Sequence, residues 1–235
     1  MDYKIIGQTV PVVEMKLKAG ESVYTQSGGM AYQTEGIEMK SNAKGGILKG
    51  IGRMFAGESM FMATYTAQKD DATIAFASTV PGSVMPVDLS ENPGGMMLQK
   101  GSFLCAEDDV TTSVAFTKKF GAGFFGGEGF ILQKAEGKGK LFLEVDGDPI
   151  EKILAPGEVL KVSTGNVVAF ESGVKYEVGM IKGLGNILLG GEGLFLTKLV
   201  GPGRVILQSQ NFGDFANRLI PYMPKPSSGA NFNFS

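Results

Sequence analysis

The chain has 235 residues, of which 43% are hydrophobic and 20% are charged, so it can bury the core of one or two globular domains. A formal net charge of −2 gives no basic cluster for phosphate binding, so nucleic acid is not an expected partner. Histidine is absent, which excludes Ser-His-Asp and Cys-His catalysis and imidazole ligation of a metal.

The first residues of the chain carry charges at Asp2 and Lys4 and include no long apolar run. They therefore predict neither a signal peptide nor a membrane span, and a cytoplasmic protein is expected. The single cysteine, Cys105, lies in an apolar run, which predicts a buried thiol of low reactivity.

A Gly-Glu pair occurs three times in one local setting, after a glycine-rich apolar stretch and before a strand-like apolar run. The three copies are Gly57-Glu58-Ser59, Gly127-Glu128-Gly129 and Gly191-Glu192-Gly193. The recurrence predicts that the chain contains three copies of one structural unit.

Further matches extend the repeat on both sides of these pairs. Downstream, Gly137-Lys138-Gly139-Lys140 corresponds to Gly201-Pro202-Gly203-Arg204, and each lies between two apolar runs, which predicts a hairpin turn. Upstream, Gly20-Glu21 corresponds to Gly157-Glu158, whereas the middle copy keeps only a turn-like Asn92-Pro93-Gly94-Gly95.

Alternating apolar and polar residues with frequent turn signals predict an all-β fold. We expect three fused β-modules, short double-stranded β-helix or sandwich-like repeats, that share one core about a pseudo-threefold axis. The expected boundaries are 1–80, 81–150 and 151–222, followed by a flexible tail over 223–235. One short amphipathic helix is predicted over Phe212–Ile220, stopped by Pro221.

The glycine-rich sequence Phe125–Phe130, its counterpart Gly190–Leu194, and the run Gly201–Ser209 resemble the Altered Inheritance of Mitochondria protein 24 family. The resemblance extends from about Tyr3 to Leu219. The resemblance implies modules similar to those of the trp RNA-binding attenuation protein. It also implies a homo-oligomer, namely a trimer. It carries over no catalytic residue.

The candidate site residues are Glu58, Glu128 and Glu192. Three equivalent carboxylates near a common axis would form a cation site or a cluster that shares a proton. The favoured interpretation is structural, with each carboxylate accepting backbone hydrogen bonds at its own turn. No catalytic residue and no cofactor is predicted, and metal binding is left open.

The segments before these glutamates mix basic and bulky apolar residues. If exposed they would form a surface for a protein or membrane partner, whereas burial would place them in the core or in a subunit interface. The sequence Gly121–Gly126 matches G-x-G-x-x-G but leads into a strand, which argues against dinucleotide binding. Acidic clusters at 107–109 and 146–148 are interpreted as loop charges.

The leading hypothesis is therefore a non-enzymatic, oligomeric scaffold or binding platform. The first alternative is an enzyme that uses carboxylate or lysine chemistry in a cleft between modules. The second, RNA binding, rests on fold analogy alone.

Overall fold

The computed structural model describes residues 1–26, 29–42, 62–118, 129–180 and 195–223. These residues form β-strands joined by turns and short 3-10 segments, and one α-helix near the C-terminus. The first strands are β1 (Asp2–Ile6), β2 (Val12–Leu17), β3 (Ser22–Gln26), β4 (Met30–Gln33), β5 (Ile37–Asn42), β6 (Met62–Ala67) and β7 (Ala72–Ala77). The all-β prediction is confirmed.

The remaining strands follow in chain order. The central strands are β8 (Gly82–Asp88), β9 (Met96–Gln99), β10 (Phe103–Glu107), β11 (Val110–Lys118), β12 (Phe130–Gly137) and β13 (Lys140–Asp146). The last are β14 (Pro149–Leu154), β15 (Val159–Ser163), β16 (Val167–Glu171), β17 (Lys175–Met180), β18 (Phe195–Val200) and β19 (Gly203–Gln208).

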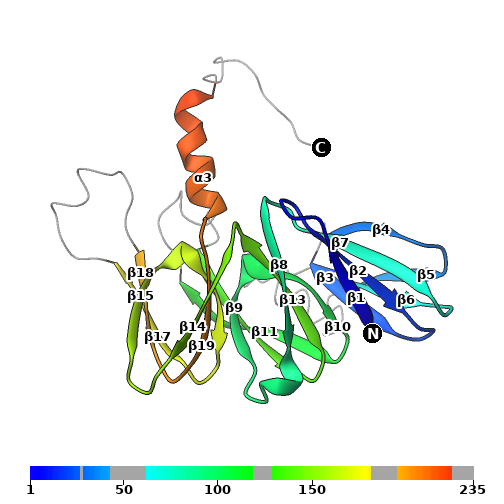
Figure 1. Cartoon of the computed structure of the whole chain (residues 1–235), viewed down its shortest axis with the longest axis horizontal. Helices are drawn as coiled ribbons and strands as arrows, with labels where there is room; N and C mark the ends of the chain where they lie inside the picture. Colours follow the sequence, from blue (N-terminus) through cyan, green and yellow to red (C-terminus); the bar gives the residue numbers. More distant parts are fainter. Residues whose placement is uncertain (27–28, 43–61, 119–128, 181–194, 224–235) are drawn as a thin grey trace.

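The strands form four antiparallel sheets. The first has the order β1-β2-β7-β4, the second β5-β6-β3-β10-β13-β8, the third β11-β12-β9-β16-β19-β14 and the fourth β15-β18-β17. In Figure 1 the strands progress from blue at one end of the longest axis to yellow and orange at the other.

The same strand order recurs along the chain. We name β2–β7 unit 1, β8–β13 unit 2 and β14–β19 unit 3. In each unit the first, sixth and third strands lie side by side, as do the second, fifth and fourth. Units are joined by pairing β3 with β10 and β9 with β16, and we call these two pairings the internal junctions. The pseudo-threefold axis and the module boundaries stay predictions.

Three clusters of apolar side chains lie between successive sheets. The first includes Met15 and Phe76 of the first sheet with Phe142 of the second. The next joins the second and third sheets, and the last joins the third and fourth. The central strands of the second and third sheets are therefore buried on both faces, which explains apolar runs without alternation such as Phe103–Ala106, in which every residue is buried.

The hairpin predicted at each G-x-G-basic turn is wrong. The turn after β12 leads into β13, yet β12 belongs to the third sheet and β13 to the second, so the two strands do not pair. The glycines are required by close packing instead. Gly137 has φ of +133°, and a Cβ on it would lie 2.1 Å from the carbonyl oxygen of Asp109.

The predicted C-terminal helix is confirmed as α3 (Phe212–Leu219). The Asn211 side chain caps it by accepting a hydrogen bond from the Asp214 N–H at 3.0 Å. A 3-10 turn that contains Pro221 follows. None of the residues of α3 is buried, and in Figure 1 the helix stands away from the sheets.

Candidate functional site

The three candidate glutamates, Glu58, Glu128 and Glu192, lie outside the described residues. Each belongs to a segment that connects the fourth and fifth strands of its unit, namely β5 to β6, β11 to β12 and β17 to β18. Most of the basic and apolar segments before these glutamates, and Gly121–Gly126, also lie outside them. A cation cluster formed by these glutamates stays a prediction.

Two other glutamates of the repeat are described, and each closes its own turn. The Glu21 carboxylate accepts a hydrogen bond from the Lys18 N–H at 2.9 Å, and the Glu158 carboxylate accepts one from the Ala155 N–H at 2.8 Å. In both turns the glutamate N–H also bonds to the carbonyl of that same partner, at 3.0 Å. At these positions the Gly-Glu pair is a structural device that starts a strand.

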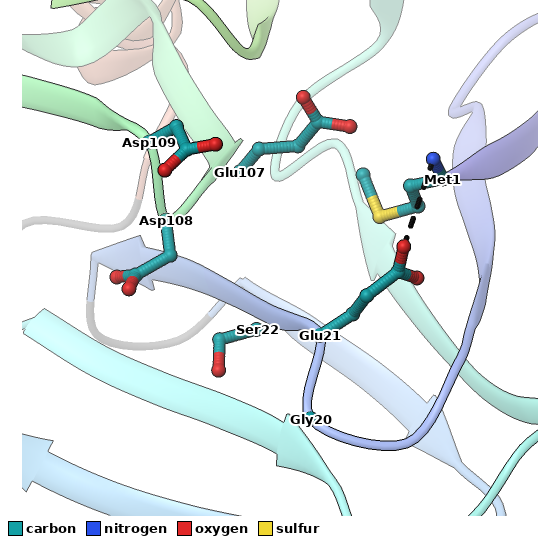
Figure 2. Close-up of a pocket in the computed structure, with 7 residues that line it drawn as sticks. All are labelled: Met1, Gly20, Glu21, Ser22, Glu107, Asp108 and Asp109. Atoms are coloured by element: carbon teal, nitrogen blue, oxygen red, sulfur yellow. Dashed lines mark ion pairs between the residues drawn. The ribbon is translucent and has the colours of Figure 1, made fainter.

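A pocket of about 380 Å³ lies beside the first internal junction. Its walls come from residues 20–22, which lead into β3, and from residues 107–109, at the end of β10 and in the turn after it, with Met1 at one side. Figure 2 shows the four carboxylates of Glu21, Glu107, Asp108 and Asp109 around it. The lining is therefore predominantly acidic and favours cations or basic groups.

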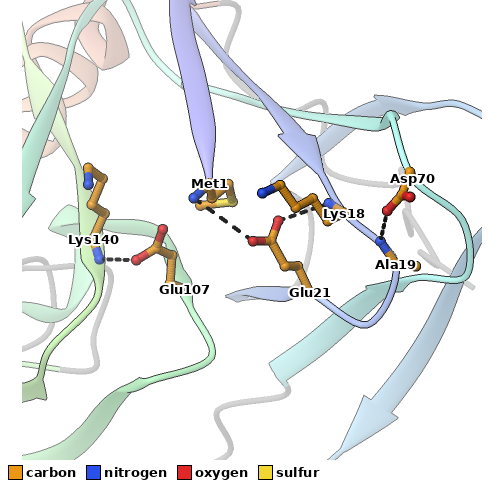
Figure 3. Close-up of polar contacts among 7 residues, drawn as sticks. All are labelled: Met1, Lys18, Ala19, Glu21, Asp70, Glu107 and Lys140. Atoms are coloured by element: carbon orange, nitrogen blue, oxygen red, sulfur yellow. Dashed lines mark hydrogen bonds and ion pairs between the residues drawn. The ribbon is translucent and has the colours of Figure 1, made fainter.

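Backbone donors already hold two of these carboxylates. Glu107 accepts a hydrogen bond from the Lys140 N–H at 2.6 Å, and Glu21 lies 4.0 Å from the N-terminal ammonium of Met1 in addition to its turn bond. Figure 3 shows these contacts together with the bond from the Ala19 N–H to Asp70. Both glutamates thus fix the ends of strands.

The connections between units are held by buried polar side chains. One oxygen of Glu144, which is 6% exposed, accepts hydrogen bonds from the hydroxyls of Ser78 and Thr79 and from the N–H groups of Thr79 and Val80. Gln208 accepts from the Asp146 N–H at 3.0 Å and donates to the carbonyl of Gly165 at 2.8 Å. These contacts fix the unit 1–unit 2 and unit 2–unit 3 connections.

Asp146 also anchors α3. Its carboxylate accepts a hydrogen bond from the Phe212 N–H at 2.7 Å, and burial raises its pKa. Asp146 is therefore more than a solvated loop charge, because its carboxylate positions the helix.

The third strand of each unit has a different environment. β10 and β16, at the internal junctions, are buried along nearly their whole length, and Cys105, Ala106, Ala169 and Phe170 are all 0% exposed. All residues of β4 are exposed, and Tyr32 reaches 44%. The reason is topological, because β4 is the last strand of the first sheet and has β7 as its only partner among the described strands.

The second strand of unit 3, β15, also has one side without a partner among the described strands. β3 and β9 each lie between two strands, whereas β15 is the last strand of the fourth sheet and pairs with β18 alone among the described strands. We call the unpaired sides of β4 and β15 the open edges. These open edges were not predicted from the sequence. One signal was present, because β4 has the polar Gln33 at the position where β10 has Ala106 and β16 has Phe170.

The remaining chemistry is sparse within the described part of the chain. Cys105 is free and buried, as predicted, and burial raises the pKa of its thiol well above the ordinary value. No group of three or more Cys, Asp or Glu side chains suited to a metal occurs among the described residues. None of the described helices has the length and apolar character needed to cross a membrane.

Comparison with known proteins identifies relatives of nearly the same length. Uncharacterized protein M6_Spy0233 of Streptococcus pyogenes serotype M6 is 32% identical over 226 residues, covering 93% of this chain and 89% of that protein. The X-ray crystal structure of protein SPYM3_0169 from Streptococcus pyogenes, a structural genomics target, is similar with a TM-score of 0.77 and 28% identity, covering 94% of this chain and 99% of the other.

Residues 3–210 match the family described as Mitochondrial biogenesis AIM24, which confirms the resemblance found in the glycine-rich sequences. The similarity to the trp RNA-binding attenuation protein stays a prediction. Because the match covers most of its length, the chain belongs to the AIM24 family.

Proposed function

We propose that this protein is a non-enzymatic, homo-oligomeric scaffold or binding platform of the cytoplasm. The single observation that carries the proposal is the contrast between β4 and its counterparts. Among the described strands, the third strand has two neighbours in units 2 and 3 but one in unit 1, and β15 lacks the second neighbour that β3 and β9 have. Copies of the chain satisfy both open edges by associating with one another.

The physical basis is the backbone on these strands. An exposed edge presents N–H and C=O groups that template pairing with another chain unless the protein blunts the edge. β4 has no proline and no charged residue along Met30–Gln33, so it lacks these two forms of edge protection. It also exposes Met30 and Tyr32, whose burial on association removes apolar surface from water.

The experiment is the mass of the native chain by light scattering, compared with that of a Gln33→Pro variant. Thr34 N–H bonds to the Thr73 carbonyl at 2.8 Å, so in an antiparallel ladder the N–H of Gln33 points away from β7. Proline there removes an outward donor and keeps the internal ladder. The expected result is an oligomer for the native chain and a single-chain mass for the variant.

The matched control is Ile153→Pro on another outer strand, β14. Ser209 N–H bonds to the Asp148 carbonyl at 3.0 Å, so alternation points the N–H of Ile153 outward, as at the native Pro149. This control should keep the native mass. A native mass equal to one chain at every concentration overturns the proposal, as does equal loss of association in both variants.

The enzyme alternative draws on the acidic pocket at the first internal junction. Four carboxylates surround it, but the two glutamates are used as backbone acceptors, which supports a structural role more than carboxylate chemistry. RNA binding is the least supported alternative, since the net charge is −2.

A protein or membrane-surface partner remains part of the proposal, and α3 is the described element that supports it. Phe212, Phe215 and Leu219 occupy one side of the helix at three- and four-residue spacing and are 43–46% exposed. Co-sedimentation with anionic vesicles, native chain against Phe215→Ser, tests the membrane version. A native chain that stays in the supernatant ends it.

A further inference from the structure

We infer that β15 of one copy pairs antiparallel with β4 of the next, in the register of the internal junctions. This inference rests on the proposed self-association and specifies its geometry. The second and third sheets each combine three strands from one unit with three from the next. The fourth sheet, β15-β18-β17, is the first half of such a sheet, and β4-β7-β2 of the first sheet is the second half.

The position of β4 in the register follows from three equivalent contacts at the start of the last strand. Glu107 accepts a hydrogen bond from the Lys140 N–H at 2.6 Å, and Glu171 accepts one from the Arg204 N–H at 3.0 Å. In unit 1 the hydroxyl of Thr34 accepts the bond from the Thr73 N–H, at 2.9 Å. Thr34 is therefore the counterpart of Glu107 and Glu171.

A shared irregularity supports this assignment. The ladder between the third and last strands shifts register between Met30 and Tyr32 in unit 1. It shifts at the corresponding place, before Cys105, in unit 2 and before Ala169 in unit 3. β4 thus has the same bulged shape as the two strands that are paired at the internal junctions.

The position of β15 follows from its turn. The Glu21 and Glu158 turns have the same hydrogen bonds, so Val159 is the counterpart of Ser22, and Leu160 that of Val23. At the first internal junction Val23 lies opposite Glu107. Leu160 of one copy therefore lies opposite Thr34 of the next.

The same register sets the remaining pairs. Lys161 lies opposite Gln33 and Val162 opposite Tyr32, as Tyr24 lies opposite Ala106 and Thr25 opposite Cys105. Both internal junctions continue one residue further, through the bonds from Asp108 N–H to the Ser22 carbonyl at 3.2 Å and from Ser172 N–H to the Gly95 carbonyl at 3.1 Å. The matching bond between copies joins the Glu35 N–H to the Val159 carbonyl.

Side-chain packing is consistent with this register. Val162 belongs to the apolar cluster between the third and fourth sheets, and the alternation of the strands places Tyr32 on that same face. The exposed Tyr32 ring thus covers the border of this cluster in the neighbouring copy. The pair of Lys161 and Gln33 is polar where the first internal junction has Tyr24 with Ala106 and the second has Met97 with Phe170, so the contact between copies is weaker than a junction.

Disulfide trapping tests the register. Leu160 and Thr34 form a non-hydrogen-bonded pair, with Cα atoms about 4.5 Å apart in an antiparallel ladder, which lies within the range for a disulfide. A chain with Thr34→Cys and one with Leu160→Cys are prepared separately and then mixed under mild oxidation. The native Cys105 does not compete, because it is fully buried.

The expected result is a covalent pair of chains in the mixture, reversed by reductant, and little or none in either variant alone. The matched control replaces Leu160→Cys by Lys161→Cys, which places the thiol on the opposite face of the strand and should not cross-link. A head-to-tail contact requires this asymmetry, whereas a two-fold contact between identical strands cross-links a single variant with itself.

The outcomes separate the two proposals. Oligomers by light scattering in both variants, with no cross-linking above the Lys161→Cys control, overturn the register and leave self-association standing. Cross-linking of either variant alone overturns the head-to-tail geometry. A native chain of single-chain mass overturns self-association and the register together.

Discussion

The two inner sheets each combine three strands from one unit with three from the next, whereas each outer sheet contains only one half of that order. β10 and β16 are buried because a strand of the preceding unit lies beside each, whereas β4 is exposed because β7 is its only neighbour among the described strands. The sequence follows this environment, with Phe103–Ala106 on β10 apolar throughout and β4 carrying Tyr32 and Gln33. The difference shows that position in the series of units, and not connectivity, decides which residues a strand can hold.

The largest expected effect comes from an aromatic side chain at an internal junction. Phe170 on β16 is 0% exposed, so Phe170→Ala leaves a cavity and should lower the free energy of unfolding by about 3–5 kcal/mol. The matched Tyr32→Ala on β4 should leave the unfolding of the single chain nearly unchanged. Urea denaturation of both variants measures the contrast, and equal losses would break the comparison.

The next effect concerns the connection between units 1 and 2. Glu144→Leu leaves the N–H groups of Thr79 and Val80 without their buried acceptor, which should cost about 2–4 kcal/mol of unfolding free energy. Glu144→Gln retains an acceptor oxygen and should cost less. Thermal and urea unfolding provide the measurement, and a leucine variant as stable as the native chain would contradict the assigned role.

A pH effect is expected at the buried tyrosine of the first internal junction, Tyr24. Burial raises the pKa of Tyr24 to about 12, so the neutral phenol is favoured in the folded chain. The raised pKa stabilises the folded chain fully at pH values below about 10, the ordinary pKa of tyrosine. This stabilisation is lost as the pH rises from about 10 to about 12, which lowers the free energy of unfolding by roughly 2 kcal/mol. Urea unfolding across this range measures it, and Tyr24→Phe should remove this component of the pH dependence.

The smallest effect is expected at the open edge itself. Tyr32→Phe removes the hydroxyl that donates to the Glu14 carboxylate and keeps the ring. Because this pair is exposed, the unfolding midpoint of the single chain should stay within error. Association of copies should persist, because the aromatic ring still covers the neighbouring copy. Dissociation of the variant, measured by light scattering, would instead show that the Tyr32 hydroxyl is needed for association.

Sequence patterns predicted much of the local structure correctly. The all-β class, the burial of Cys105 and the helix over Phe212–Leu219 are confirmed, because each depends on nearby residues and on hydrophobic pattern. The hairpin at Gly137–Lys140 is wrong because a glycine turn allows either pairing or a crossing between sheets, and only tertiary packing selects one.

The candidate site was less accessible to such reasoning. Glu58, Glu128 and Glu192 lie outside the described residues, so their role stays a prediction. The acidic pocket brings together Glu21 and Glu107, which come from different units. The open edges are defined by which strands lie side by side, and this is not apparent from the sequence. Both properties arise from strand pairing over long separations, where composition carries little information.

Sharing of sheets between units has a consequence for cooperativity. A cut after residue 80 would separate β3 from β10, and would divide the second sheet into two halves that each expose backbone donors and acceptors. We therefore expect that no unit folds independently and that hydrogen exchange detects the opening of whole sheets rather than of single units. Much of the stability of the three units is therefore expected to come from the strand pairs between them.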